Sequence, residues 1–255
     1  MQYGIREICN VVLKDVVTKE PKAYFETLKT STMEFGGSTV YATGGQGNVK
    51  RLGWDSDREI TMKMEDGLIS KETLAVATGT EFKTTTRSVH QKEVLSVEEE
   101  GADKIIKLTK KPTTVKGYST FFFKTDDGSS IGEKLTGVVT TTGSNTKVKL
   151  TGTALEVGDK VIADYYIDAP TKSQSMDITS KTFPGTYTLE ADTLWRNEDG
   201  VDIPAKYTIP KLKVKPNFTL THGAAGDPSV FNFETEVLAD KKTGDGMVFI
   251  DLLEE

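Results

Sequence analysis

One five-residue run has the spacing of a catalytic nucleophile. Residues 128–132 read Gly-Ser-Ser-Ile-Gly, which fits the pattern that places a serine on a sharp turn between a strand and a helix. The chemistry also needs an acid and a histidine further along the chain, and Asp164 or Asp168 and His222 are the available partners. No helical pattern follows Ser130, so we interpret the run as part of a hairpin turn. A hydrolase remains a third hypothesis, which unchanged esterase turnover in a Ser130→Ala variant would exclude.

Other candidates for phosphate or metal chemistry lack the context that such sites need. Gly44-Gly45-Gln46-Gly47 has neither the Gly-Lys-Ser/Thr ending nor the following helix of a phosphate-binding loop, so we predict a flexible loop. His90 and His222 are the only histidines and lie far apart, and Cys9 is the only cysteine, which excludes an internal disulfide and a cysteine-based zinc site. Two acidic pairs are predicted to lie in solvated turns: Asp55/Asp57 and Asp126/Asp127. We therefore expect no catalytic residue, no metal and no cofactor.

The elements that would carry these residues are almost all strands. Ile60, Met62 and Met64 alternate with polar residues, as in a half-buried strand. Ser70 and Gly79 are suited to the two ends of a short helix over residues 71–78, the only helix predicted. The stretch 247–253 is apolar on both faces and is expected to be covered on both. The fold class is therefore all-β, mainly a β-sandwich or partly closed barrel with one short flanking helix.

A change in composition at residues 98–101 suggests an insertion. Five short strands between residues 105 and 167 are separated by turns at the spacing of a small sandwich. We predict a core from residues 1–100 and 169–255, with residues 101–168 as an inserted small β-sandwich, immunoglobulin-like domain. The net charge of −6 over 255 residues and the absence of a basic tract disfavour nonspecific binding to DNA. The chain starts with no apolar signal segment and has no apolar run of membrane-spanning length, so we expect synthesis in a cytoplasm and no membrane partner.

The segment 36–57 is expected to be a long polar loop. Compact domains seldom keep such loops unless the loop functions, is disordered or docks onto a neighbour. Trp54 is in a setting where a large ring often anchors a contact surface, packing onto its own domain being the alternative, whereas Trp195 is expected in the core. The loop is too apolar for a linker, and we predict docking through these residues: Val40, Tyr41, Val49, Lys50, Arg51, Leu52 and Trp54.

Several segments, taken in their order along the chain, resemble the major tail tube proteins of tailed bacteriophages. They are 54–60, the strand and helix of 66–79, Phe183-Pro184-Gly185-Thr186-Tyr187, 209–214, 217–221, 226–233 and 247–251. The resemblance covers residues 20–95 and 180–252 and leaves residues 100–168 unmatched. It implies a β-sandwich or partly closed barrel flanked by a helix. It also implies six copies in a ring that shares an inner β-barrel, and rings stacked into a hollow tube that carries DNA out of the capsid.

The same resemblance implies the partners. Copies of the chain would form the homo-hexameric rings, and tape-measure, tail terminator and baseplate proteins would bind the tube, with a sheath if the tail is contractile. DNA would pass through the lumen without specific binding, and the protein would be located in the virion, in the phage tail, after synthesis in the host cytoplasm. By position, residues 36–54 would reach the neighbouring subunit or ring.

Two alternative functions remain open. A carbohydrate- or surface-binding β-sandwich module would use residues 101–168, where Tyr118, residues 121–123, Tyr165 and Tyr166 could stack on sugars. A capsid decoration protein would form trimers in place of six-fold rings. A monomer with an exposed aromatic cleft favours the binding module, whereas rings or tubes favour the tail tube.

Overall fold

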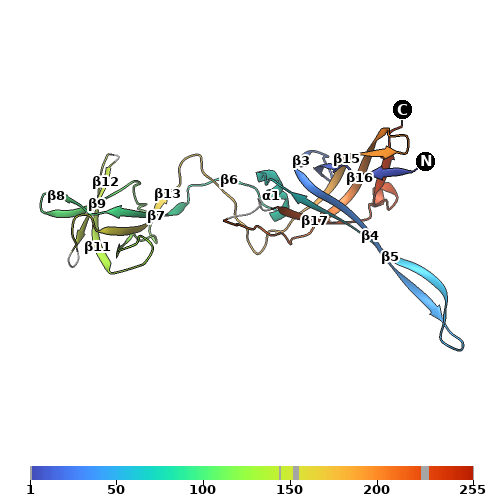
Figure 1. The fold of residues 1–255 in the computed structure, drawn as a ribbon, viewed down its shortest axis with the longest axis horizontal. Coiled ribbons are helices and arrows are strands. Elements are labelled where there is room, and N and C mark those ends of the chain that lie inside the picture. The colour runs from blue at the N-terminus through green and yellow to red at the C-terminus, as the bar shows by residue number, and fades with distance from the viewer. Residues whose placement is uncertain (1, 144, 152–154, 225–229, 255) are drawn as a thin grey trace. The chain divides into compact units, whose positions relative to one another are not determined.

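The computed structural model describes residues 2–143, 145–151, 155–224 and 230–254. The chain forms two compact units. Unit 1 contains residues 1–82 and 176–255, and unit 2 contains residues 83–175. In each unit nearly all of the regular structure is antiparallel β-sheet (Figure 1). The all-β class is therefore confirmed, and none of the sheets formed by the described residues is closed into a barrel.

Unit 1 contains a nine-stranded sheet. Its main path runs β3-β2-β15-β16-β17-β5-β4, with β1 added on β15 and β18 on β16. The strands are β1 (Tyr3–Ile5), β2 (Asn10–Asp15), β3 (Pro21–Phe25), β4 (Leu28–Thr43), β5 (Lys50–Asp66), β15 (Thr186–Asn197), β16 (Asp202–Val214), β17 (Phe231–Val237) and β18 (Phe249–Leu252). A 3-10 turn, η1 (Lys241–Thr243), precedes β18.

The alternating apolar residues of these strands build the unit 1 core. The sheet curls over this core, so that the ring of Phe25 on β3 meets that of Phe233 on β17 at 5.1 Å between centroids. Ile60, Met62 and Met64 of β5 are all buried, as their alternation with polar residues predicts. Of the described residues, eighteen buried apolar ones form this one cluster, enough to support unit 1 as a folding unit of its own.

Helix α1 (Lys71–Thr78), the one α-helix in the described part of the chain, has the bounds expected from its end signals. Ser70 accepts a hydrogen bond from the Thr73 amide at 2.9 Å, and the Thr73 hydroxyl accepts one from the Ser70 amide at 3.0 Å. Gly79 ends the helix in the left-handed conformation at φ 75°. The helix lies against β3 and buries Val76 and Ala77 in the unit 1 core.

Unit 2 contains a seven-stranded sheet in the order β7-β13-β10-β11-β12-β9-β8. A separate two-stranded pair, β6 with β14, joins the points where the chain enters and leaves the unit. The strands are β6 (Lys83–Thr84), β7 (Ser88–Ser96), β8 (Glu98–Glu100), β9 (Asp103–Leu108), β10 (Phe121–Thr125), β11 (Lys134–Thr142), β12 (Asn145–Thr151), β13 (Lys160–Asp168) and β14 (Gln174–Ser175). A second apolar cluster, which includes Ile106, Val148, Val161 and Tyr165, fills its core.

The limits of unit 2 differ from the expected insertion at residues 101–168. β7 pairs with β13 along its whole length, from Ser88 opposite Asp168 to Ser96 opposite Lys160. This pairing joins residues 88–96 to the inserted sheet, and unit 2 runs from residue 83 to residue 175. The change at residues 98–101 marks the β8–β9 hairpin inside the unit.

The expectation that residues 247–253 are covered on both faces is wrong for the single chain. β18 pairs with β16 at the margin of the sheet, from Ala205 opposite Leu252 to Thr208 opposite Phe249. Phe249 and Ile250 are 40% and 46% exposed. Only Met247 and Val248, which precede the strand, pack against the unit 1 core.

Candidate assembly interface

The segment expected to be a polar loop is instead the outer part of a long β-hairpin. β4 and β5 pair from Leu28 opposite Asp66 to Thr43 opposite Lys50, and the hairpin extends beyond the rest of unit 1 (Figure 1). The run of glycines forms its turn, with Gly45 and Gly47 at φ 83° and 85°. The sequence of this segment mixes glycines with polar residues, which led to the prediction of a loop. The segment is in fact a strand pair, and its outer part does not pack on the core.

A β-bulge divides the hairpin into an inner and an outer part. Between the pairs Gly36–Glu59 and Ser38–Ser56, β5 has one residue more than β4. Asp57 lies at this bulge with φ 52°, and the Ser38 hydroxyl donates to its carboxylate at 2.6 Å. Hydrogen bonds from the hydroxyls of Ser38 and Ser56 lower the pKa of Asp57, so its carboxylate stays charged and accepts both hydrogen bonds at the bulge.

Beyond the bulge, the apolar side chains are on the opposite face of the hairpin. On β4, Phe35 is on the core face, so Val40, an odd number of residues further on, faces away from the core. On β5, the extra residue moves Trp54 and Leu52 to the same side as Val40. We call this side the outer apolar face, and it consists of Val40, Ala42, Leu52 and Trp54, with Val40 opposite Trp54 and Ala42 opposite Leu52.

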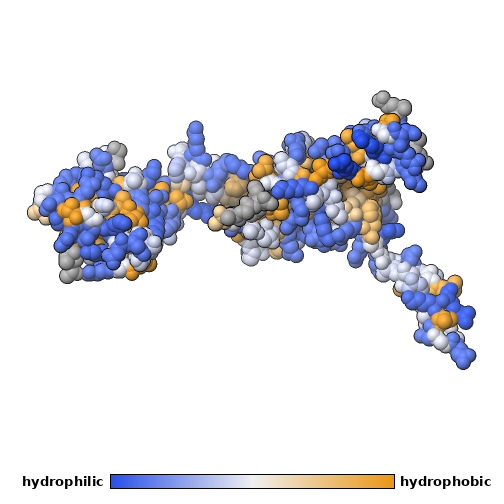
Figure 2. All heavy atoms as spheres, viewed as in Figure 1, coloured by the Kyte–Doolittle hydropathy of each residue, from blue (hydrophilic) through white to orange (hydrophobic). Residues whose placement is uncertain are grey.

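Among the described residues of unit 1, none covers the outer apolar face. Val40 and Leu52 are each 62% exposed and Trp54 is 57% exposed. Figure 2 shows hydrophobic residues gathered on the end of the hairpin among hydrophilic ones. Packing of Trp54 onto its own domain is thereby excluded for the single chain. Exposed apolar groups that share one face mark an interaction site more often than isolated ones do.

The remaining predicted interface residues lie on the other face or at the turn. Tyr41 is 44% exposed, and the Lys50 ammonium stands 3.9 Å from its ring centroid. Arg51, at a second register shift next to the turn, donates from Nε to the Gly44 carbonyl at 3.4 Å. Val49, in the turn, is 49% exposed. The seven residues thus lie together on one element, but of them only Val40, Leu52 and Trp54 are on the outer apolar face.

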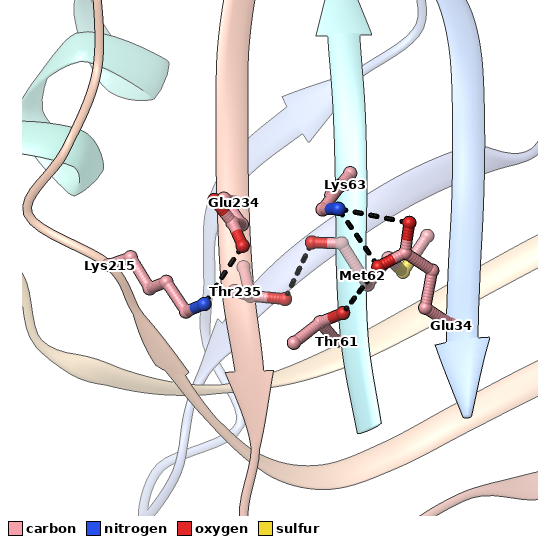
Figure 3. Close-up of polar contacts among 7 residues, drawn as sticks. All are labelled: Glu34, Thr61, Met62, Lys63, Lys215, Glu234 and Thr235. Atoms are coloured by element: carbon pink, nitrogen blue, oxygen red, sulfur yellow. Dashed lines mark hydrogen bonds and ion pairs between the residues drawn. The ribbon is translucent and has the colours of Figure 1, made fainter. Parts of the chain in front are cut away.

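The root of the hairpin is held by polar contacts across neighbouring strands (Figure 3). The Lys63 ammonium on β5 contacts both Glu34 carboxylate oxygens on β4, at 2.9 and 2.8 Å. A hydrogen bond from Lys63 lowers the pKa of Glu34, and the same contact raises the pKa of Lys63. Thr235 on β17 donates to the Met62 carbonyl at 3.2 Å, with its side chain fully buried. These contacts orient the hairpin relative to the core.

The structure does not support the nucleophile at Ser130. Its hydroxyl donates to the Asp127 carboxylate at 2.6 Å, and Asp127 also accepts the amides of Ser129 and Ser130 at 2.8 Å each. These bonds lower the pKa of Asp127 and fix the turn between β10 and β11. The next element is β11, a strand, so the strand–helix geometry of a nucleophile elbow is not formed.

The candidate ligand sites have local structural roles. Asp55 accepts the Thr39 hydroxyl at 2.7 Å across the hairpin. His90 contacts Asp164 at 2.9 Å. Among the described residues, no group of three or more His, Cys, Asp or Glu side chains is placed to hold a metal ion. The described part of the chain also has no helix long and apolar enough to cross a membrane.

The aromatic residues considered for sugar binding divide into two sets. Phe122 and Tyr165 are buried in the unit 2 core, at 3% and 0% exposure, and cannot stack on a ligand. Tyr118 is 40% exposed and contacts the ring of Tyr166 at 4.6 Å between centroids. Phe121 is 39% exposed. Trp195, expected in the core, is half-buried, and its indole nitrogen donates to the Tyr207 hydroxyl at 3.0 Å.

Sequence reasoning missed the apolar surface at the open end of the unit 1 core. Phe35 is 55% exposed, and Ile250 lines the same cavity from β18. Phe35 continues the alternation of Met33 on β4, a signal that could have placed it on the core face. Its exposure follows only from the fold, because the sheet does not close over it.

The family of the chain follows from a comparison with protein-family models. The model of the YomU/Tube protein family matches residues 3–250, which includes both units and the whole hairpin. A comparison with individual curated proteins finds no match. The segment 226–229, which contributes to the resemblance noted in the sequence, lies outside the described residues. Since the match extends over nearly the full length, the chain belongs to the YomU/Tube protein family.

Proposed function

We propose that the protein is a structural subunit of a phage tail tube. Six copies form a ring, and stacked rings form a hollow conduit through which DNA leaves the capsid without specific binding. The protein then resides in the virion, where tape-measure, tail terminator and baseplate proteins, and a sheath in a contractile tail, would contact the tube. The family name supports a tube-like structural role and no enzymatic one.

One structural observation carries the proposal of self-assembly. The β4–β5 hairpin extends outside the core with an outer apolar face that none of the described residues of its own unit covers. Burying apolar surface contributes about 25 cal/mol per Å². Association with another chain that buries the outer apolar face is therefore favourable. When one kind of subunit carries both halves of such a contact, the contacts close into rings or continue as filaments.

The test is negative-stain electron microscopy of the purified protein at high concentration, with and without added salt or mild heating. We expect six-fold rings or hollow rods. A matched variant replaces residues 39–55 with Asn-Gly, because Ser38 and Ser56 are paired across the hairpin and a two-residue turn can join them. This variant should keep the unit 1 core and remain monomeric. Equal assembly by the shortened chain, or trimers in place of rings, would contradict the proposal.

A second candidate function is carbohydrate or surface binding by unit 2. The observation in its favour is the pair of exposed aromatic sites at Tyr118 and Phe121. A glycan array probed with the full chain tests this function. We expect a Tyr118→Ala, Phe121→Ala double variant to lose any signal while it retains assembly, because both residues lie in unit 2 and the hairpin lies in unit 1.

A further inference from the structure

The open end of the unit 1 core contains an apolar cavity, which we call the socket. It has a volume of about 330 Å³. Its lining residues are Ile5, Glu7, Cys9, Ser31, Met33, Phe35, Met62, Thr193, Trp195, Tyr207 and Ile250. Most of these side chains are apolar or aromatic, and Phe35 and Ile250 remain about half exposed. The socket thus exposes apolar surface that a partner could cover.

The hydroxyl groups of the socket are already bonded within the chain. Ser31 Oγ accepts the Cys9 amide at 3.3 Å. Thr193 Oγ1 donates to the Glu7 carbonyl at 3.1 Å, and the Tyr207 hydroxyl accepts the Trp195 indole N–H. A site for a small polar ligand presents convergent polar groups to its ligand. This socket instead presents mainly hydrocarbon, which matches an occupant with apolar side chains.

The hairpin of the same chain cannot fill its own socket. Along β4, Val40 is five residues beyond Phe35 at the socket wall, about 17 Å away at roughly 3.3 Å per residue. The bulge also turns the outer apolar face away from the side on which Phe35 lies. A rigid strand pair therefore holds the apolar side chains and the socket apart within one molecule.

We propose that the socket of one copy receives the outer apolar face of the hairpin of a second copy. This inference rests on the proposed function and names the receiving surface for its assembly contact. Leu52 and Trp54 supply large apolar groups for the cavity. The charges also agree, because Arg51 lies beside Leu52 on the hairpin whereas the ionised side chain of the socket wall is Glu7. Lys50 and Asp55 are engaged on the other face of the hairpin, with Tyr41 and Thr39. The contact is heterologous, since each copy uses its hairpin to bind one neighbour and its socket to bind another.

The only cysteine of the chain provides the test, because Cys9 lines the socket. An Ala42→Cys variant adds a second thiol on the outer apolar face and leaves Leu52 and Trp54 in place. The purified full-length variant is treated at high concentration with a short bis-maleimide and analysed on a denaturing gel. Burial raises the pKa of the Cys9 thiol, so the reaction is run at mildly alkaline pH. We expect a ladder of cross-linked dimers, trimers and longer species, because every copy carries one thiol on its hairpin and a second thiol in its socket.

Three matched variants control the experiment. Cys9→Ser in the Ala42→Cys background should stop the ladder at dimers, because only one thiol per copy remains. Val17→Cys places the second thiol on a turn of unit 1 where Val17 is 81% exposed, and should give no ladder. Trp54→Ser in the Ala42→Cys background should weaken the ladder several-fold, with the fold checked by circular dichroism. A ladder of equal strength from Val17→Cys, or none from Ala42→Cys, overturns the proposal.

Electron microscopy of the same samples separates the socket from the proposed function. Rings or tubes without a ladder overturn the socket and leave the tube function standing, whereas the absence of both overturns the two together. The wild-type chain gives an independent measurement through the rate at which a monofunctional maleimide labels Cys9. This rate should fall several-fold as assembly proceeds. Protection of Cys9 that is equally strong in dilute monomer indicates another occupant and also overturns the proposal.

Discussion

The environment of Tyr165 strongly alters its ionisation. Its side chain is fully buried in unit 2, and its hydroxyl donates to the Glu93 carboxylate at 2.8 Å. Burial, followed by the hydrogen bond and the negative charge of Glu93, raises the pKa of Tyr165 to about 12. Glu93 also accepts the Thr109 hydroxyl and amide, so one carboxylate joins β7, β13 and the segment after β9.

We predict that Tyr165 makes the stability of unit 2 depend on alkaline pH. The folded pKa lies above the ordinary value of about 10, so the folded chain keeps a proton that the unfolded chain loses. The stabilisation is fully present below pH 10 and is lost as the pH rises from about 10 to about 12. Urea unfolding at several pH values should show this loss. Tyr165→Phe should reduce the slope and, near neutral pH, cost up to about 2 kcal/mol for the lost hydrogen bond.

A tyrosine outside the core provides the control. Tyr24 is 59% exposed in unit 1, and Tyr24→Phe should leave the alkaline slope unchanged. An unchanged slope in Tyr165→Phe would show that other groups carry the effect.

At the level of single residues, the sequence identified the alternating core positions but not every exposed side chain. Ile60, Met62 and Met64 alternate with polar residues, and a strand with one buried face produces that pattern. Tyr165 and Tyr166 could not be told apart in this way, since both faces of β13 carry apolar residues and Ile162 is buried as well. Which face meets the core depends on pairing with β7 and β10, which are distant in sequence.

Helix α1 shows how both ends of a short element are fixed by single residues. Eight residues are too few for a stable isolated helix, so the end contacts and the packing against β3 must hold it. Gly79 ends it at φ 75° and donates its amide to the Ala75 carbonyl at 2.8 Å. A β-carbon at this position would lie 2.1 Å from the Phe183 carbonyl oxygen. The glycine is therefore required both by its backbone conformation and by the close approach of another segment.

We predict that Gly79→Ala destabilises unit 1 by about 3 kcal/mol or more. A left-handed alanine costs roughly 1–2 kcal/mol, and displacement of the backbone at Phe183 adds to this cost. Gly244→Ala is the matched control, because Gly244 has a similar φ of 70° but a β-carbon there would meet nothing within 4 Å. The control should cost only about 1–2 kcal/mol. Chemical unfolding of both variants measures the difference, and equal losses would contradict the role of the Phe183 contact.

Elements with one buried face were easier to predict than elements with none. Helix α1 was predicted with its observed bounds because its end residues have specific conformational roles. The outer hairpin was expected to be a loop because beyond the bulge it has no core side, so its apolar residues follow no single alternation. β18 was expected to be covered on both faces because its sequence is apolar throughout, whereas the single chain covers it only in part.

At the scale of the whole molecule, unit 2 has the topology of an insertion. The chain leaves unit 1 after residue 82 and returns at residue 176. Thr84 and Lys83 of β6 pair with Gln174 and Ser175 of β14, which brings the two crossing points side by side. Each unit has its own apolar cluster. The sequence predicted that an insertion exists, but its limits depend on strand pairing across some 70 residues, which composition does not report.

We predict that unit 1 folds and assembles without unit 2. Residues 85–173 can be replaced by Asn-Gly, because Thr84 and Gln174 are directly opposite and a two-residue turn fits between paired strands. Calorimetry should show one cooperative transition for the shortened chain, and residues 83–175 expressed alone should show another. The shortened chain should still form rings or tubes under the electron microscope, because the hairpin, the socket and β18 all belong to unit 1. An unfolded shortened chain would show that unit 1 depends on the insertion for its stability. A folded chain that no longer assembles would assign part of the ring contact to unit 2.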